Sequence, residues 1–138
     1  MPANYTDHFE HMLDEKRRLT VPAEWRDEGY EKQLFVFPSA DGCLKVYPNS
    51  WLAARQEKIA DLKMGDPLRK QIERVAGTAQ KLVWDGQGRV RVKDGLLARA
   101  GIDRAVLMVG ALDHFELWDP GRRESVSPVE VNVEEADI

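Results

Sequence analysis

Residues 14–22 read DEKRRLTVP, and residues 85–93 read DGQGRVRVK. Both stretches place an aspartate four positions before an arginine, and an apolar, polar, apolar run follows in each. Internal repeats are considered first because a duplicated unit determines the architecture of the whole chain. The two stretches therefore predict a protein built from two similar halves.

The same offset keeps apolar positions in register beyond the two stretches. Trp25 coincides with Leu96, residues 35–37 with residues 106–108, and Leu44, Val46 and Tyr47 with Phe115, Leu117 and Trp118. Few of these positions are identical, so a chance match between two amphipathic stretches is the alternative. The register runs without a gap from residue 14 to residue 47, which favours an internal repeat.

Hydrophobic alternation and turn residues divide each half into strands and one short helix. In the first half we expect strands at residues 8–13, 18–21, 34–38 and 43–47, with a polar turn at 14–17 and a tight turn at Asp41-Gly42. Pro22 suits the start of the short helix and Gly29 its end. In the second half we expect strands at residues 79–84, 89–92, 105–110 and 114–118, and a helix at 94–100 that ends at Gly101.

A helical block separates the two halves. Its first part has helical spacing at Trp51, Leu52, Arg55, Ile59 and Leu62, and either Asn49 or Ser50 precedes it as a cap. Gly65-Asp66-Pro67 interrupts the pattern, and a second helix follows at residues 67–76 and ends at Gly77. The sequence thus predicts an α+β, mainly β fold with helices between and beside the two halves.

Length and composition predict one globular domain, because 138 residues is within the usual range of a single domain. Apolar residues make up 43% and charged residues 32%, which favours a packed core over disorder. We expect the domain to span residues 1–123, with halves at residues 5–64 and 78–119 joined by the helix at 67–76. Residues 124–138 hold five acids and no Lys or Arg, so we expect a flexible acidic tail, with an edge strand as the alternative.

The charge distribution permits an anionic partner despite a net charge of -4. Residues 1–123 contain 20 basic and 19 acidic residues, so a basic patch can form on a nearly neutral body. No apolar run approaches the roughly 18 residues of a membrane span. The polar and acidic residues 1–10 do not resemble a signal peptide, and Cys43 alone can form no internal disulfide. We expect a cytoplasmic protein.

The sequence has no motif for a metal, a cofactor or catalysis. His8 and His11 lie three positions apart on an expected strand, where they face opposite sides and cannot form a metal pair. No Gly-rich phosphate loop and no nucleophile elbow occurs. We therefore expect no enzyme, no cofactor and no small-molecule substrate. Cys43 is interpreted as a small core residue, and the tryptophans as core or subunit-contact residues.

A family resemblance rests on two features of the sequence. The first is the pair of Asp-x-x-x-Arg motifs, each with its strands, helix and hairpin, and the second is the stretch VGALDHFELWD at residues 109–119. Over about residues 5–120 the chain resembles the MraZ family of bacterial transcriptional regulators. The resemblance implies an AbrB-like swapped-hairpin β-barrel with a pseudo-two-fold axis between interlocking halves. It also implies a nucleoid-associated, ring-shaped homo-oligomer that binds double-stranded DNA upstream of the gene cluster for cell division and wall synthesis.

Two positions depart from the family pattern. Arg17 stands where the family usually has glycine in its first motif, whereas the second motif keeps Gly88. If this position needs a positive φ, Arg17 strains the turn; if it does not, Arg17 adds a charge for phosphate. Lys93 stands where the family often has proline, and we expect Asp94 to cap the following helix instead.

Six basic residues are the candidate DNA contacts, because phosphates attract Lys and Arg, and Arg is the commonest reader of guanine. They are Lys16, Arg17, Arg18, Arg89, Arg91 and Lys93. A pseudo-two-fold axis could bring both clusters to one face, with Arg18 and Arg89 as the main contacts. Asp14 and Asp85 are expected to be structural, since a turn carboxylate accepts backbone N–H groups. In the alternative interpretation, the arginines are ordinary solvated residues paired with these aspartates.

The motifs and the resemblance together predict a sequence-specific DNA-binding transcriptional regulator. Weak contacts to DNA repeats about one helical turn apart would combine through effective concentration in an oligomer. The competing hypothesis is an oligomeric protein-interaction scaffold of the same fold, with DNA binding lost or incidental. An enzyme is the third possibility, and only scattered carboxylates favour it.

Overall fold

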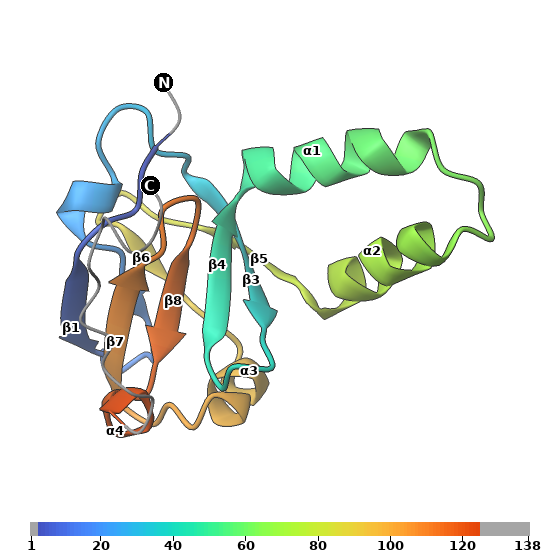
Figure 1. Ribbon diagram of the computed structural model, residues 1–138. Helices are drawn as coiled ribbons and strands as arrows, with labels where there is room; N and C mark the ends of the chain where they lie inside the picture. Colours follow the sequence, from blue (N-terminus) through green and yellow to red (C-terminus); the bar gives the residue numbers. More distant parts are fainter. Residues whose placement is uncertain (1–2, 125–138) are drawn as a thin grey trace, which may run out of the picture.

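Short strands and helices alternate through residues 3–124, which are the residues that the computed structural model describes (Figure 1). The chain first forms β1 (His8–Met12), β2 (Leu19–Thr20), the 3₁₀ helix η1 (Ala23–Trp25), β3 (Gln33–Pro38) and β4 (Leu44–Pro48). The central helices are α1 (Asn49–Ala60) and α2 (Pro67–Thr78). They are followed by β5 (Gln80–Val83), β6 (Arg89–Val90), α3 (Asp94–Arg99), β7 (Ala105–Gly110), β8 (Phe115–Trp118) and α4 (Pro120–Glu124).

Strands from before and after the central helices pair with one another. One antiparallel sheet has the order β1-β7-β8-β4-β3-β5, and β2 pairs with β6 in a separate ladder. Four of the pairs, β1–β7, β3–β5, β4–β8 and β2–β6, join the two parts of the chain. The two parts are therefore interlocked. The α+β, mainly β fold is confirmed, but a closed barrel is not, because β1 and β5 are the edges of the described six-stranded sheet.

Alternate residues of the two hairpins, β3–β4 and β7–β8, form much of the core. Its strand residues are Leu34, Val36, Leu44, Val46, Val106, Met108, Phe115 and Leu117, all buried. Trp25 is only 1% exposed and packs against the rings of Tyr5, Phe9 and Phe115. Cys43 is buried as a small core residue, and burial raises the pKa of its thiol.

The gap-free register between the two halves is wrong for β3. Val36 lies opposite Val46, as Met108 lies opposite Leu117. Val46 and Leu117 differ by 71 positions and Val36 and Met108 by 72, so the register shifts by one residue. The tight turn of the second hairpin is one residue shorter than that of the first, which restores the original offset at β8.

Several predicted boundaries also differ from those of the structure. The helix expected from Pro22 to Gly29 is a single 3₁₀ turn that ends at Trp25, whose buried indole Nε1 donates to the Thr6 carbonyl at 3.0 Å. The strands expected at 18–21 and 89–92 are only two residues long. Pro22 has no N–H for the ladder, and the N–H of Lys93 is diverted to Gln80 Oε1 at 2.8 Å.

The central helices form a hairpin that projects from the sheet (Figure 1). Neither α1 nor α2 has a buried residue. Asp66 caps α2 by accepting the N–H of Leu68 at 2.8 Å, and Gly77 lies inside α2 rather than at its end. Most of the expected acidic tail lies outside the described residues; Glu124 is the last residue of α4, a helix that the sequence did not predict.

We predict that Trp25→Ala lowers the free energy of unfolding by about 3–5 kcal/mol, because it removes a large buried side chain at the centre of the aromatic cluster. Trp51→Ala, in the projecting α1, should cost clearly less because Trp51 is only partly buried. Urea denaturation at neutral pH measures both values. Equal losses would contradict this placement of the core.

Candidate nucleic-acid interface

The two Asp-x-x-x-Arg turns have the same hydrogen bonds. Asp14 Oδ1 accepts the backbone N–H groups two and four positions later, at 3.0 and 2.7 Å. Asp85 Oδ1 accepts the corresponding pair at 2.9 Å each. The second carboxylate oxygen accepts Nε of Arg18 in the first turn and of Arg89 in the second, both at 2.8 Å. Each carboxylate therefore ties backbone and arginine together at the start of β2 or β6.

These hydrogen bonds lower the pKa of both turn carboxyls. The pKa of Asp85 falls to about 2, chiefly because its carboxylate accepts the backbone N–H of Arg89. The pKa of Asp14 is lowered chiefly by the backbone N–H of Arg18. The charged carboxylates are thus the forms that fit the folded turns.

The position before each motif arginine has a positive φ. The angle is +62° at Arg17 and +79° at Gly88. A Cβ at Gly88 would overlap the side chain of Arg26, which covers this turn and donates from Nε to the Val21 carbonyl at 2.8 Å. The second turn therefore requires glycine both for its backbone conformation and for space.

Arg17 adopts the same backbone conformation, and its guanidinium forms hydrogen bonds with residues of the second half of the chain. Its Nε donates to Asp94 Oδ1 at 3.0 Å, and its Nη1 donates to the Asp103 carbonyl at 3.0 Å. Asp94 therefore pairs with Arg17 and does not cap α3. Lys93 at the N-cap position has no side-chain acceptor for the first N–H groups of this helix. Arg17 thus strains the turn and also bonds it to the second half of the chain.

The β2–β6 ladder decides which basic residues meet. Its antiparallel register pairs Leu19 with Val90 and Thr20 with Arg89. The segment after β6 therefore runs back beside the first turn, where Arg91 Nε donates to the Lys16 carbonyl at 3.1 Å. Five of the six candidates lie at this end of the ladder, and only Arg89 lies at the other. The structure therefore brings residues of both motifs together, as a pseudo-two-fold axis could do, but leaves Arg89 apart from the other five.

The six candidates differ in how their side chains are engaged. Arg18 and Arg89 are held by their turn aspartates. Arg91 bonds to the Lys16 carbonyl and lies 3.6 Å from Asp94. The side chains of Lys16 and Lys93 are exposed and make no ion pair or hydrogen bond with the described residues. These two lysines are therefore the candidates whose charge is most available to phosphate.

Two further basic residues beside the turns were missed by motif reasoning. The Arg104 carbonyl accepts the N–H of Leu13 at 2.8 Å, just before the first turn. The Lys32 carbonyl accepts the N–H of Trp84 at 3.3 Å, just before the second. Arg104 and Lys32 correspond at the offset of 72, which a gap-free comparison at 71 conceals.

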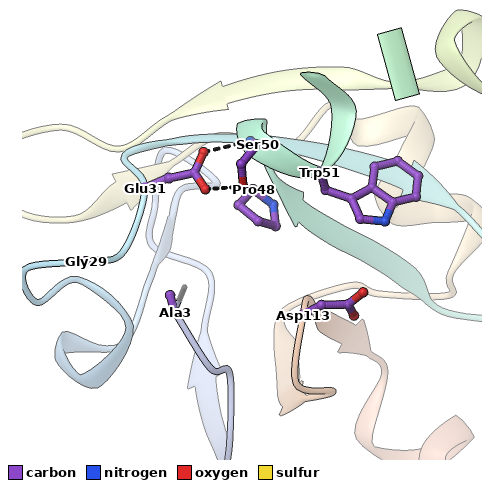
Figure 2. Close-up of a pocket in the computed structure, with 7 residues that line it drawn as sticks. All are labelled: Ala3, Gly29, Glu31, Pro48, Ser50, Trp51 and Asp113. Atoms are coloured by element: carbon purple, nitrogen blue, oxygen red, sulfur yellow. Dashed lines mark hydrogen bonds between the residues drawn. The ribbon is translucent and has the colours of Figure 1, made fainter. Parts of the chain in front are cut away.

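A pocket on another part of the surface contains the hydrogen bonds that cap the start of α1 (Figure 2). Its lining residues are Ala3, Gly29, Glu31, Pro48, Ser50, Trp51 and Asp113. The Glu31 carboxylate accepts both the N–H and the hydroxyl of Ser50 at the start of α1. The sequence predicts Asn49 or Ser50 as the cap of this helix. In the structure Pro48 occupies the N-cap position and has no side-chain acceptor. The Glu31 carboxylate, which is distant in sequence, accepts the N–H of Ser50 instead.

Two features, a metal cluster and a membrane-spanning helix, are absent from the part of the chain that the structure describes. No group of three or more His, Cys, Asp and Glu side chains there could hold a metal ion. No helix there is both long and apolar enough to cross a bilayer.

We predict that Asp85→Asn destabilises the protein at neutral pH and that the difference from wild type shrinks as the pH falls from about 4 to about 2. The folded-state pKa of about 2 lies below the unfolded value, so the carboxylate stabilises the protein above the unfolded pKa and loses this effect on protonation. Urea denaturation of both proteins at a series of pH values measures the difference. A difference that stays constant down to pH 2 would refute the charged turn.

We predict that Gly88→Ala costs at least about 1–2 kcal/mol, because alanine must adopt a positive φ and displace Arg26. Gly86→Ala is the matched control, since the space around a Cβ at Gly86 is open. Thermal or urea unfolding compares the two variants. Equal stabilities would show that the second turn does not require glycine.

Comparison with known proteins connects these turns to a family. The family model described as "MraZ protein, putative antitoxin-like" matches the chain twice, over residues 5–74 and 75–126. The protein named "Transcriptional regulator MraZ" of Acidovorax sp. (strain JS42) is 35% identical over 129 residues, which are 91% of this chain and 89% of that protein. The protein of the same name from Thermomicrobium roseum is 32% identical over 117 residues, 84% of this chain and 82% of that protein. The one from Corynebacterium efficiens is 38% identical over 108 residues, 78% of this chain and 75% of that protein.

These relatives are named as regulators of transcription and not as enzymes. On both the family model and these relatives, the chain belongs to the MraZ family.

Proposed function

We propose that the protein is a sequence-specific DNA-binding transcriptional regulator. The observation that carries this proposal is the gathering of Lys16, Arg17, Arg18, Arg91 and Lys93 at one end of the β2–β6 ladder. Relatives covering most of the chain are named transcriptional regulators. The partner would be double-stranded DNA, contacted in the cytoplasm at the nucleoid.

The chemistry of the surface suits this role. Lys16 and Lys93 offer ammonium groups to phosphates, whose neutralisation supplies much of the affinity of such proteins for DNA. Arg18 and Arg89 each have Nε fixed by a carboxylate, which holds the plane of the guanidinium in one orientation. A guanidinium fixed in this way loses little conformational entropy on binding, so the two arginines would be the contacts to base edges.

The oligomer and its target are part of the same proposal. The crossed strand pairs and the matching turns support a swapped-hairpin barrel of the AbrB type, although the six-stranded sheet is open. The unburied helices α1 and α2 provide a surface for ring assembly. A ring would present its basic ends repeatedly, which suits repeats in DNA upstream of the gene cluster for cell division and wall synthesis.

A protein-interaction scaffold is the second candidate function, and the central hairpin favours it. An apolar groove between α1 and α2 is lined by Trp51, Leu52, Arg55, Leu68, Gln71, Ile72 and Val75. Leu68 and Val75 are 39% and 40% exposed. Such a groove fits a protein partner whether or not DNA is bound.

We predict that the protein binds duplex DNA from upstream of its own gene more tightly than a scrambled duplex at about 150 mM salt, where non-specific binding is already weak. The double variant Arg18→Ala/Arg89→Ala should weaken this binding at least about tenfold. Fluorescence anisotropy measures both affinities, and circular dichroism checks that the double variant is folded.

The control is Lys81→Ala, which removes an exposed basic residue of β5, outside the two turns and the projecting hairpin, and should leave the affinity unchanged. Sedimentation of the same samples reports the oligomeric state. A folded, oligomeric protein that binds neither duplex would refute the regulator proposal and favour the scaffold.

A further inference from the structure

The two turns have matching hydrogen bonds, but the two ends of the β2–β6 ladder at which they lie have opposite charge. The first-turn end consists of residues 14–18 and residues 91–104, which pack beside them through the Arg91–Lys16 and Arg17–Asp103 bonds. The second-turn end consists of residues 85–89 and residues 20–32, joined through the N–H of Val21 to the Gly88 carbonyl at 2.8 Å. The first-turn end contains seven basic and four acidic residues, whereas the second-turn end contains three basic and five acidic residues.

Ion pairs within each end increase this difference in available charge. Two of the four acids at the first-turn end, Asp14 and Asp94, are bonded to arginines of the same end. Lys16, Lys93 and Arg104 are exposed there and make no side-chain ion pair with the described residues.

At the second-turn end the balance is reversed. Glu24, Asp27 and Glu28 are exposed and make no side-chain ion pair with the described residues. Of the basic residues, Arg89 is held by Asp85, and Arg26 is half-buried against Gly88. Lys32 is the one basic residue of this end that is exposed rather than partly buried.

We infer that each protomer holds the DNA backbone at its first-turn end alone, with Lys16, Lys93 and Arg104 as the phosphate contacts. This inference rests on the proposed DNA binding and adds Arg104 to the interface. A phosphate at the second-turn end would face three unpaired carboxylates, and their repulsion would oppose binding there. The two turns are therefore alike in their backbone, but only the first-turn end contacts phosphates.

Arg104 is assigned to this surface by its surroundings. Together with Leu13, Asp14, Glu15 and Arg17 it lines a shallow hollow beside the first turn. Its carbonyl is fixed by the N–H of Leu13, so the backbone of Arg104 is anchored while the residue is exposed. Lys32 occupies the corresponding position beside the second turn, with a similarly anchored carbonyl.

The correspondence of Arg104 and Lys32 supplies a matched test. The dependence of DNA affinity on salt, plotted as log K against log salt concentration, reports the number of phosphates neutralised, at about 0.9 per contact for duplex DNA. Arg104→Gln should reduce the magnitude of this slope by about 0.9 for each bound protomer, and Lys16→Gln/Lys93→Gln/Arg104→Gln by about 2.7. Lys32→Gln, the control, should leave the slope unchanged. All four side chains are exposed, so the folded state is preserved, and circular dichroism verifies this.

The possible outcomes test this inference separately from the proposed DNA binding. Wild-type binding with slopes that fall only for the first-turn variants supports one-sided contact. Wild-type binding with equal changes for Arg104→Gln and Lys32→Gln, or with no change for the triple variant, overturns the inference and leaves DNA binding intact. If the wild-type protein binds no duplex at any salt concentration, the proposed function fails and the inference fails with it.

Discussion

The two-residue ladder between β2 and β6 is the constraint on which the arrangement of this protein depends. It joins a strand from before the central helices to one from after them, and it is antiparallel. Each strand begins at a turn whose aspartate bonds to both the backbone and an arginine. Because these turns set the position of β2 and β6, they also set which loops of one half contact the other.

Much of this fold could be predicted from the sequence, because its signals are local. Alternating apolar residues locate β3, β4, β7 and β8, and a Gly-Asp-Pro sequence locates the break between α1 and α2. The Asp-x-x-x-Arg spacing predicts a carboxylate that accepts N–H groups two and four positions later. Each of these features depends on residues close together in the chain.

The features that could not be predicted depend on partners distant in sequence. Nothing near Arg17 indicates that its guanidinium pairs with Asp94, and nothing near Ser50 indicates that Glu31 takes the place of a local cap. The one-residue shift at β3 hides the correspondence of Arg104 and Lys32, because two short changes of length cancel along the chain. The candidate basic residues were identifiable, but their distribution between the two ends follows from strand direction. A motif read on its own cannot supply that direction.

The projecting hairpin has a consequence for the dynamics of the molecule. Two helices of 12 residues, neither with a buried side chain, have little tertiary packing to stabilise them. Such a segment opens locally at a lower free energy than the sheet, and its amide hydrogens exchange while the sheet is still protected. Any molecule that covers the hairpin therefore also folds it more completely, and part of the interaction energy is used for that ordering. Assembly through this segment would be coupled to helix formation, so the affinity would change with temperature more steeply than in the association of two rigid surfaces.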